Sequence, residues 1–199
     1  MLFLLKLVLI GVYLRQQEAV ILSIEFKLSR APEMLEQYYD LRQHCFRQEL
    51  GIPDFDGSED ELDRQGQIFL AIQGDRVIGG ARISARLPVQ DYHQELDLIP
   101  QTCCMWERSF LDPAERSPQL FREFCVHLVG ATRMLGYQYA MILSSLRNAR
   151  FYRQCHSSMG IDFQIHRKVW DCGQGVFFGL EHYLSVANLH ERQSLRLVA

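Results

Sequence analysis

The sequence predicts a single domain of the mixed α/β (α+β) class, in which one central sheet carries helices on both of its faces. The chain has 199 residues, which fits one domain with a short extension. Hydrophobic residues make up 48% of the chain and charged residues 23%, so enough apolar material is present for a sizeable core. Along the chain, segments whose apolar side chains recur at strand spacing are interspersed with segments whose apolar side chains recur at helix spacing. This order of elements favours a sheet with helices packed on it.

The first elements are expected to be a strand and a helix. Residues 21–28 alternate and are rich in β-branched side chains, which indicates a strand. Ser29 and Pro32 then open a helix, and Gly51 ends it. The apolar residues that recur at helical spacing between them are Leu35, Tyr38, Leu41, Cys45 and Phe46.

A hairpin is expected next. Residues 67–73 and 76–84 read as two strands, and Gly74-Asp75 between them has the composition of a tight turn. The acidic run at residues 59–63 precedes the hairpin and is typical of a solvated loop.

The second half of the chain is expected to contain the most clearly marked helix. It runs from Ser117 to Leu135, with Ser117 as N-cap, Pro118 at the first helical position and Gly136 as the C-terminal stop. The other expected elements are strands at 103–111, 137–144, 163–170 and 176–180 and a helix at 148–159.

Several classes of protein are disfavoured by composition. A net charge of −3 gives no basic footprint for nucleic acid. The six cysteines form no C-x-x-C pair and are interpreted as free thiols of a reducing cytosol, so a cytoplasmic location is expected. The seven histidines lack H-x-x-x-H and H-E-x-x-H spacing, so no metal site is expected.

The N-terminal segment is interpreted as an extension at residues 1–20, followed by the domain at residues 21–199. Residues 1–14 are strongly apolar, but a membrane-spanning helix needs about 20 residues. The run also lacks the charge placement and small-residue cleavage site of a signal peptide. A membrane span or export is therefore not expected, and weak association of this segment with a membrane surface is the alternative.

The order of elements resembles the GNAT fold, and local phrases resemble one branch of it, the acyl-homoserine-lactone (autoinducer) synthases and related N-acyl amino acid synthases. Arg42, Phe46 and the phrase at 49–52 are similar to the start of those proteins, with Ile52 in place of a tryptophan. Glu61 and Asp63 resemble the family's acidic segment, but Gly66 stands in place of its last aspartate. Val77-Ile-Gly-Gly-Ala-Arg82 resembles a phrase of its hairpin. Trp106-Glu107 resembles its W-E phrase, but the arginine that follows this phrase in the family is displaced here.

The resemblance implies a bacterial N-acyltransferase with a mostly antiparallel sheet that splays into a cleft. Its expected donor is acyl-CoA, acetyl-CoA or the phosphopantetheine thioester of an acyl carrier protein, and its acceptor is the amine of an amino acid or related small molecule. The substrate-binding residues that it implies are Arg42, Phe46, Glu61, Asp63 and Arg82.

The start of the Ser117 helix is the expected site for the phosphates of the donor, because free N–H groups and the helix dipole attract anions. The residues predicted to bind the cofactor there are Arg116, Ser117, Gln119 and Leu120. This segment has no glycine, and Pro118 has no N–H. A well-capped core helix without a binding role is the alternative.

Two residues are candidates for proton transfer. Glu107 is the candidate base for the amine, and a structural ion pair with Arg82 or Arg108 is its alternative role. Tyr152, in a phrase that resembles the GNAT helix bearing a catalytic tyrosine, is the candidate acid for the departing thiolate. A packing role for Tyr152 is the alternative.

Three functions follow as hypotheses. The first is an N-acyl synthase of the autoinducer type, and the second is an ordinary acetyl-CoA-dependent N-acetyltransferase. The third is a catalytically silent binding module of the same fold.

Overall fold

The computed structural model describes residues 23–85, 92–169 and 180–190. The extension predicted at residues 1–20 and most of the strand predicted at 176–180 lie outside these ranges. In the described part of the chain, no helix is both long and apolar enough to cross a membrane.

One seven-stranded sheet forms the centre of the molecule, in the order β1-β2-β3-β4-β5-β7-β6. Its strands are β1 (Ile24–Ser29), β2 (Gln67–Gln73), β3 (Arg76–Ser84), β4 (Cys103–Leu111), β5 (Tyr139–Ser144), β6 (Asp162–Val169) and β7 (His182–Asn188). Neighbouring strands are antiparallel except β4 and β5, which are parallel. The mixed, mostly antiparallel sheet predicted from the sequence is therefore confirmed.

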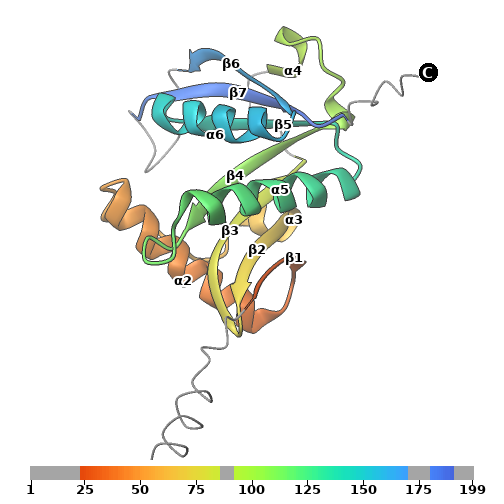
Figure 1. Ribbon diagram of the computed structural model, residues 1–199. Coiled ribbons are helices and arrows are strands. Elements are labelled where there is room, and N and C mark those ends of the chain that lie inside the picture. Colours follow the sequence, from red (N-terminus) through yellow and green to blue (C-terminus); the bar gives the residue numbers. More distant parts are fainter. Residues whose placement is uncertain (1–22, 86–91, 170–179, 191–199) are drawn as a thin grey trace, which may run out of the picture.

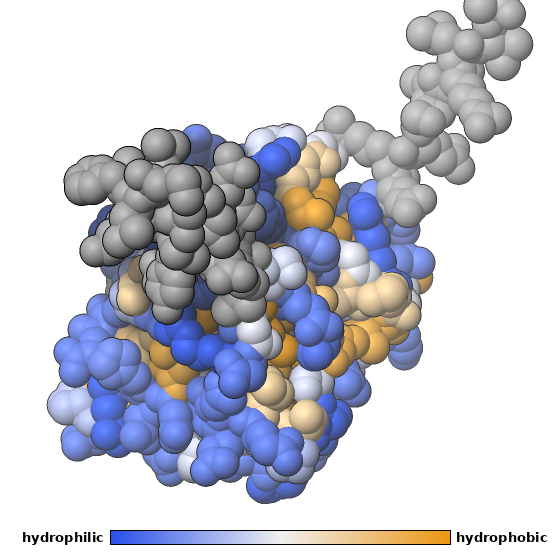
Figure 2. Space-filling view, turned by 60° about the horizontal axis from the view of Figure 1, so that its bottom comes forward, coloured by the Kyte–Doolittle hydropathy of each residue, from blue (hydrophilic) through white to orange (hydrophobic). Residues whose placement is uncertain are grey.

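Helices cover both faces of this sheet, as predicted. The elements are α2 (Pro32–Glu49), α3 (Glu61–Gln65), α4 (Tyr92–Glu95), the 3-10 turn η1 (Pro100–Thr102), α5 (Pro118–Met134) and α6 (Leu146–Ser158). In Figure 1, α5 and α6 lie across the same side of the sheet, and β4 passes behind them. In the space-filling view of Figure 2 the coloured surface is largely hydrophilic, with hydrophobic side chains gathered on part of it.

The core is divided by the sheet into two layers. Beneath α5 and α6, side chains such as Phe124, Leu128 and Cys155 pack on Trp106 and Ala140 of the sheet. Beneath α2, the buried cluster consists of Tyr38, Cys45, Ile68, Leu70, Ile72, Val77 and Phe110. Because side chains of a strand alternate between faces, each strand supplies both layers.

The turn chemistry explains why the central strands begin and end where predicted. Gly74 has a φ of +66°, which glycine adopts without strain, and it reverses the chain between β2 and β3. Ser117 accepts a hydrogen bond from the Leu120 N–H and caps α5. Strand β7 was not anticipated, and α3 was interpreted as a solvated loop.

The sheet splits between β4 and β5. The two strands pair at three positions, Cys103 with Tyr139, Cys104 with Ala140 and Met105 with Met141. Beyond Met105, β4 pairs with β3, whereas β5 continues along β7. The splayed cleft predicted from the sequence is confirmed, and α5 and α6 both begin beyond its open end because they follow these two strands.

Candidate functional site

A network of buried ion pairs lies on the α2 side of β4. Arg42 of α2 donates two hydrogen bonds to Asp63 of α3, at 3.0 and 2.9 Å. Arg82 of β3 donates to the same Asp63 at 3.0 Å, to Asp60 at 2.7 Å and, through Nε, to Glu107 of β4 at 3.1 Å. Four of the predicted site residues are thus brought together from four separate elements.

The charges within this network hold one another in their ionised forms. Burial lowers the pKa of Arg82, but the carboxylates of Glu107, Asp60 and Asp63 outweigh it and raise the pKa above its usual value. Burial raises the pKa of Asp60, and the positive charge of Arg82 overcomes this and lowers it. Such buried charges need full pairing, because an unpaired one is costly in a low-dielectric interior.

The short helix α3 positions the acidic members of the network. Asp60 caps the helix: its side chain accepts from the Asp63 N–H, and Asp63 accepts from the Asp60 N–H in return. A Cβ at Gly66 would lie 2.9 Å from the carbonyl oxygen of Leu62, so no aspartate fits where the family pattern places one. The acidic residues that join the network from this segment are Asp60 and Asp63. The D-x-x-D spacing of their reciprocal cap is the sequence signal that the analysis of the acidic run missed.

The expected residue Glu61 lies apart from the network. It is exposed on α3, and its carboxylate accepts a hydrogen bond from Gln65. The charge of Asp63 is instead met by Arg42, whose Nε also donates to the carbonyl of Gly57 at 3.0 Å. At Gly57 a Cβ would lie 2.3 Å from the Cβ of Gln43, so only glycine allows this close approach to α2.

An aromatic corner with a cation over it adjoins the network. The rings of Phe46 and Phe55 stack with their centroids 4.7 Å apart. The guanidinium carbon of Arg108 lies 5.8 and 5.1 Å from their centroids. Burial and the positive charges of Arg82 and Arg42 lower the pKa of Arg108. Phe46 is one helical turn from Arg42, so it borders the same cluster.

A bulge in β4 places candidate site residues on both faces of the sheet. Arg82 is opposite Glu107 and Gly80 is opposite Phe110, so β4 has an extra residue, and Arg108 has a φ of +51°. Arg108 contacts the rings on the α2 side, and Ser109 contacts α6 on the other side. The bulge therefore lies between the ion-pair network and the α5–α6 layer.

Tyr152 of α6 meets β4 from that second side. Its hydroxyl donates to the Oγ of Ser109 at 2.9 Å, across the split between β4 and β5. Burial, followed by the neighbouring Cys125, raises the pKa of Tyr152 above its usual value. The phenol therefore stays protonated at neutral pH and is able to donate. Ser109 was not singled out from the sequence.

His156 lies one turn further along α6, in a fully buried aromatic cluster. Its Nδ1 contacts the carbonyl oxygen of Tyr152 at 2.7 Å, and its ring lies 5.6 and 5.1 Å from those of Trp106 and Phe163. Among the described residues Nε2 has no hydrogen-bond partner. Burial lowers the pKa of His156 to about 4.

This histidine predicts a loss of stability in mild acid. The unfolded chain binds the proton below its ordinary pKa of about 6.5, whereas the folded chain does so only near pH 4. Stability should therefore be fully present above pH 6.5 and decrease as the pH falls towards 4, by about 3 kcal/mol at most. Urea unfolding across this range should show a shallower decrease for His156→Phe than for the parent, and parallel curves would contradict this.

The start of α5 is occupied by interactions within the protein. Arg116 is held by both carboxylate oxygens of Glu49, at 2.7 and 2.9 Å, and Ser117 accepts from the Leu120 N–H. Gln119 donates to Glu123 at 2.9 Å. The four predicted cofactor-binding residues lie together as expected, but few of their polar groups remain for a pyrophosphate.

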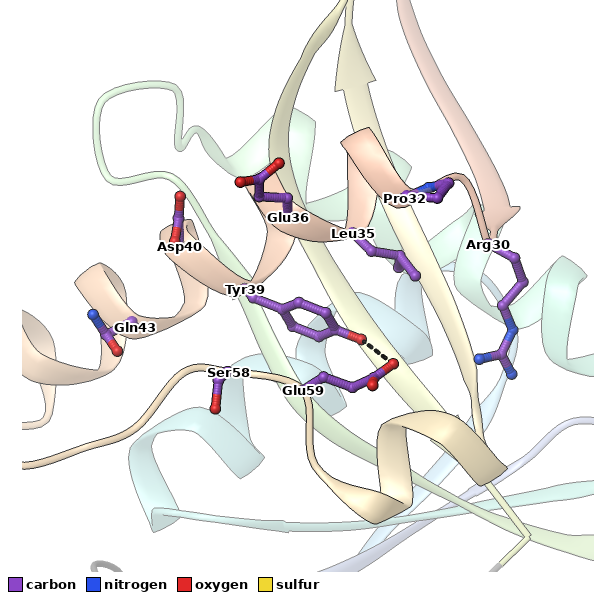
Figure 3. A pocket seen from close by; sticks show the side chains of 9 residues that line it. All are labelled: Arg30, Pro32, Leu35, Glu36, Tyr39, Asp40, Gln43, Ser58 and Glu59. Atoms are coloured by element: carbon purple, nitrogen blue, oxygen red, sulfur yellow. Dashed lines mark hydrogen bonds between the residues drawn. The ribbon is translucent and has the colours of Figure 1, made fainter.

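A groove of about 590 Å³ runs along the outer flank of α2. Figure 3 shows Tyr39 at its centre, with the hydroxyl directed at Glu59, to which it donates at 3.5 Å. The Arg42 guanidinium lies on the Tyr39 ring, 4.9 Å from its centroid, so the ring contacts both the groove and the network. The groove is lined by Arg30, Pro32, Leu35, Glu36, Tyr39, Asp40, Gln43, Ser58 and Glu59.

Solved structures share the overall fold of this chain. A protein from Lactobacillus plantarum, described as a putative N-acetyltransferase, superposes with a TM-score of 0.62 at 18% identity, covering 84% of this chain and 99% of its own. The chain has the GNAT fold. The CoA-dependent acyl-homoserine lactone synthase BjaI, bound to MTA, has a TM-score of 0.60 at 16% identity, covering 81% and 78%. The acyl-homoserine lactone synthase LasI has a TM-score of 0.60 at 14% identity, covering 84% and 91%.

These likenesses are structural, since no protein-family model and no curated protein sequence matches the chain. The described residues contain no group of three or more His, Cys, Asp or Glu side chains arranged to hold a metal.

Proposed function

We propose that this chain is an N-acyltransferase that moves an acyl group from a phosphopantetheine thioester to the amine of a small acceptor. The observation that carries the proposal is the split sheet with a carboxylate on one face and a protonated phenol on the other. Glu107 lies on the α2 side of β4, and Tyr152 reaches Ser109 of β4 from the α6 side. BjaI and the N-acetyltransferase support thioester donors by fold analogy.

In the proposed reaction the acceptor nitrogen attacks the thioester carbonyl, the new C–N bond forms, and the C–S bond breaks. Glu107 takes a proton from the amine, and Tyr152 donates its phenolic proton towards the departing sulfur. One oxygen of Glu107 is held by Arg82 and by Ser84 at 2.8 Å, while Oε1 accepts no hydrogen bond from the described residues. That oxygen is the proposed proton acceptor.

The acceptor is proposed to bind on the α2 side, next to Arg42, Phe46, Asp63 and Arg82. The helix α2 carries four carboxylates and two arginines, and the neighbouring groove has Glu36, Asp40 and Glu59 along it. Negative charge on this side favours a cationic amine, which suits an amino acid or a related molecule. An autoinducer-type acceptor and the amine of an ordinary N-acetyltransferase both meet this description.

A direct assay tests the proposal. The purified chain is incubated with acyl thioesters from two to twelve carbons (about one per two-carbon step) and with a set of amino acids and amines, while thiol release is recorded. Amine-dependent thiol release, with an amide found by mass spectrometry, is expected. Preference for long acyl groups favours the synthase, and preference for acetyl favours the acetyltransferase. If no thioester releases thiol, the hypothesis that remains is a catalytically silent GNAT-like module.

Tyr152→Phe is expected to lower turnover about tenfold and to leave the fold intact, because only the hydroxyl is removed. A thiol of ordinary pKa near 8.5 is already a good leaving group, which limits the effect. The measurement is kcat for one thioester–amine pair between pH 6 and 9 (roughly the range of thiol ionisation). The deficit should shrink with rising pH. Ser109→Ala, which removes the bonding partner alone, is the control. Unchanged turnover in Tyr152→Phe would assign the residue to packing.

A further inference from the structure

Helices α5 and α6 each carry a cysteine in the layer where the two helices meet. Cys125 of α5 is fully buried, and Cys155 of α6 is 9% exposed. Both side chains belong to the hydrophobic cluster beneath these helices, together with Tyr152. The proposed acyl transfer uses neither thiol, so the pair has no part in the chemistry described so far.

The packing of the two helices places these thiols opposite each other. Because α5 and α6 follow the parallel strands β4 and β5, they run in the same direction (Figure 1). Phe121 of α5 contacts Phe151 of α6, with ring centroids 4.5 Å apart. Cys125 and Cys155 each come four residues later, about one turn further along both helices. The thiols therefore face each other as the rings do, and a hydrogen bond joins them.

The separation of the helices is close to the span of a disulfide. Cα atoms of α5 approach those of α6 to within 8 Å. A disulfide joins Cα atoms that are about 4.4–6.8 Å apart. A small movement of α6 towards α5 therefore suffices for a bond between Cys125 and Cys155.

Cys155 is also the thiol best suited to react first. The hydrogen bond from Cys125 and the positive charge of Arg122 lower the pKa of Cys155, although burial opposes them. Among the other described cysteines, burial raises the pKa of Cys45 and Cys104, and both are more deeply buried than Cys155. Peroxides react with the thiolate, so its pKa and its exposure both favour Cys155.

We propose that Cys125 and Cys155 form a redox-active pair, which a peroxide converts into a reversible disulfide between α5 and α6. The Cys155 thiolate attacks one oxygen of the peroxide, the O–O bond breaks, and the departing hydroxide takes up a proton to become water. The Cys125 thiol then attacks the sulfur of the Cys155 sulfenic acid, so that the S–S bond forms, the S–O bond breaks and a second water leaves. In all, the two thiols lose two hydrogens, and the peroxide is reduced to water.

The disulfide acts on the position of Tyr152. This residue lies three positions before Cys155, its ring is 5.3 Å from that of Phe121, and its hydroxyl donates to Ser109 at 2.9 Å. An S–S bond of about 2.05 Å is much shorter than any contact between two thiols, so the bond draws α6 towards α5 and shifts the hydroxyl relative to Ser109. A lower turnover of the oxidised chain follows. That effect rests on the proposed function, whereas formation of the disulfide does not.

The first experiment treats the folded full chain with hydrogen peroxide. After digestion without reductant, mass spectrometry should find the Cys125 peptide joined to the Cys155 peptide, and dithiothreitol should separate them. Cys125→Ala and Cys155→Ala should each abolish this crosslink, and the control Cys45→Ala, which removes a buried thiol of α2, should retain it. A parent chain without this crosslink, a crosslink between other cysteines, or a Cys155 that only gains oxygen would overturn the redox pair.

The second experiment measures turnover after the peroxide has been removed, with amide formation from one thioester and one amine followed by mass spectrometry. Turnover of the oxidised parent should be about tenfold lower and should recover with dithiothreitol, because small displacements of a reacting group are costly. Cys155→Ala should keep its turnover through the same treatment. Unchanged turnover of a fully crosslinked parent would overturn the effect on Tyr152. If the chain shows no turnover with any donor, the proposed function fails, and the crosslink alone decides the redox pair.

Discussion

Replacing Glu107 with glutamine is expected to reduce turnover by about 10²–10⁴-fold while the protein stays folded. Glutamine keeps the shape of the side chain and can still accept from Arg82 and Ser84, but it cannot take the proton of the amine. Arg82 would keep Asp60 and Asp63 as partners, at 2.7 and 3.0 Å, so the network retains two of its carboxylates. The side chain of Glu107 is 27% exposed, which limits the effect on stability to about 1 kcal/mol.

The pH–rate profile distinguishes the base from a purely structural carboxylate. If Glu107 is the base, the deficit of Glu107→Gln shrinks at high pH, because more of the acceptor amine is already neutral. A structural Glu107 gives activity that follows the folded fraction at every pH. Ser84→Ala, which removes the other hydrogen bond to the same oxygen, is the matched control. Turnover of Glu107→Gln within a few-fold of the parent at neutral pH would exclude the base role.

Asp63→Asn is expected to produce the largest loss of stability, about 3–5 kcal/mol of the free energy of unfolding. The side chain of Asp63 is fully buried and accepts from both Arg42 and Arg82, whose side chains are buried as well. Asparagine removes the negative charge and turns one acceptor into a donor, so two buried guanidinium groups lose their common partner. Urea unfolding at neutral pH measures the loss.

Asp60→Asn is the matched control for that measurement. Asp60 belongs to the same cluster and contacts Arg82, but its side chain is 39% exposed. Water can therefore solvate the remaining charge, and a loss of about 1 kcal/mol is expected. If Asp63→Asn destabilises the protein no more than Asp60→Asn does, the buried pairing contributes little to folding. Comparing the activity of Asp63→Asn with that of the parent at equal folded fraction then shows whether Asp63 also acts in substrate binding.

Local chemistry allowed much of the fold to be predicted from the sequence. The turn at Gly74-Asp75 marks the ends of β2 and β3, and the cap at Ser117 with Pro118 marks the start of α5. These signals act within a few residues of chain, so they can be read without knowledge of the partners in space. Helix α3 was not predicted, because its acidic composition resembles that of a solvated loop, although Asp60 and Asp63 form a reciprocal cap.

The tertiary structure alone decided which charges meet. Arg42 and Asp63 are 21 positions apart, and Arg82 meets Glu107 because the register of β3 and β4 places them opposite each other. No periodicity in the sequence encodes such a pairing, because desolvation makes one buried partner depend on another from a different element.

The placement of Glu107 and Tyr152 on opposite sides of β4 was also decided by the tertiary structure. The sequence by itself determined that Glu107 and Tyr152 lie on a strand and on a helix of one mixed domain. Only the divergence of β4 from β5, and the bulge at Arg108, placed the carboxylate on one face and brought Ser109 within 2.9 Å of the phenol on the other. A bulge and a split arise from strand register, a property of paired strands that no single strand carries.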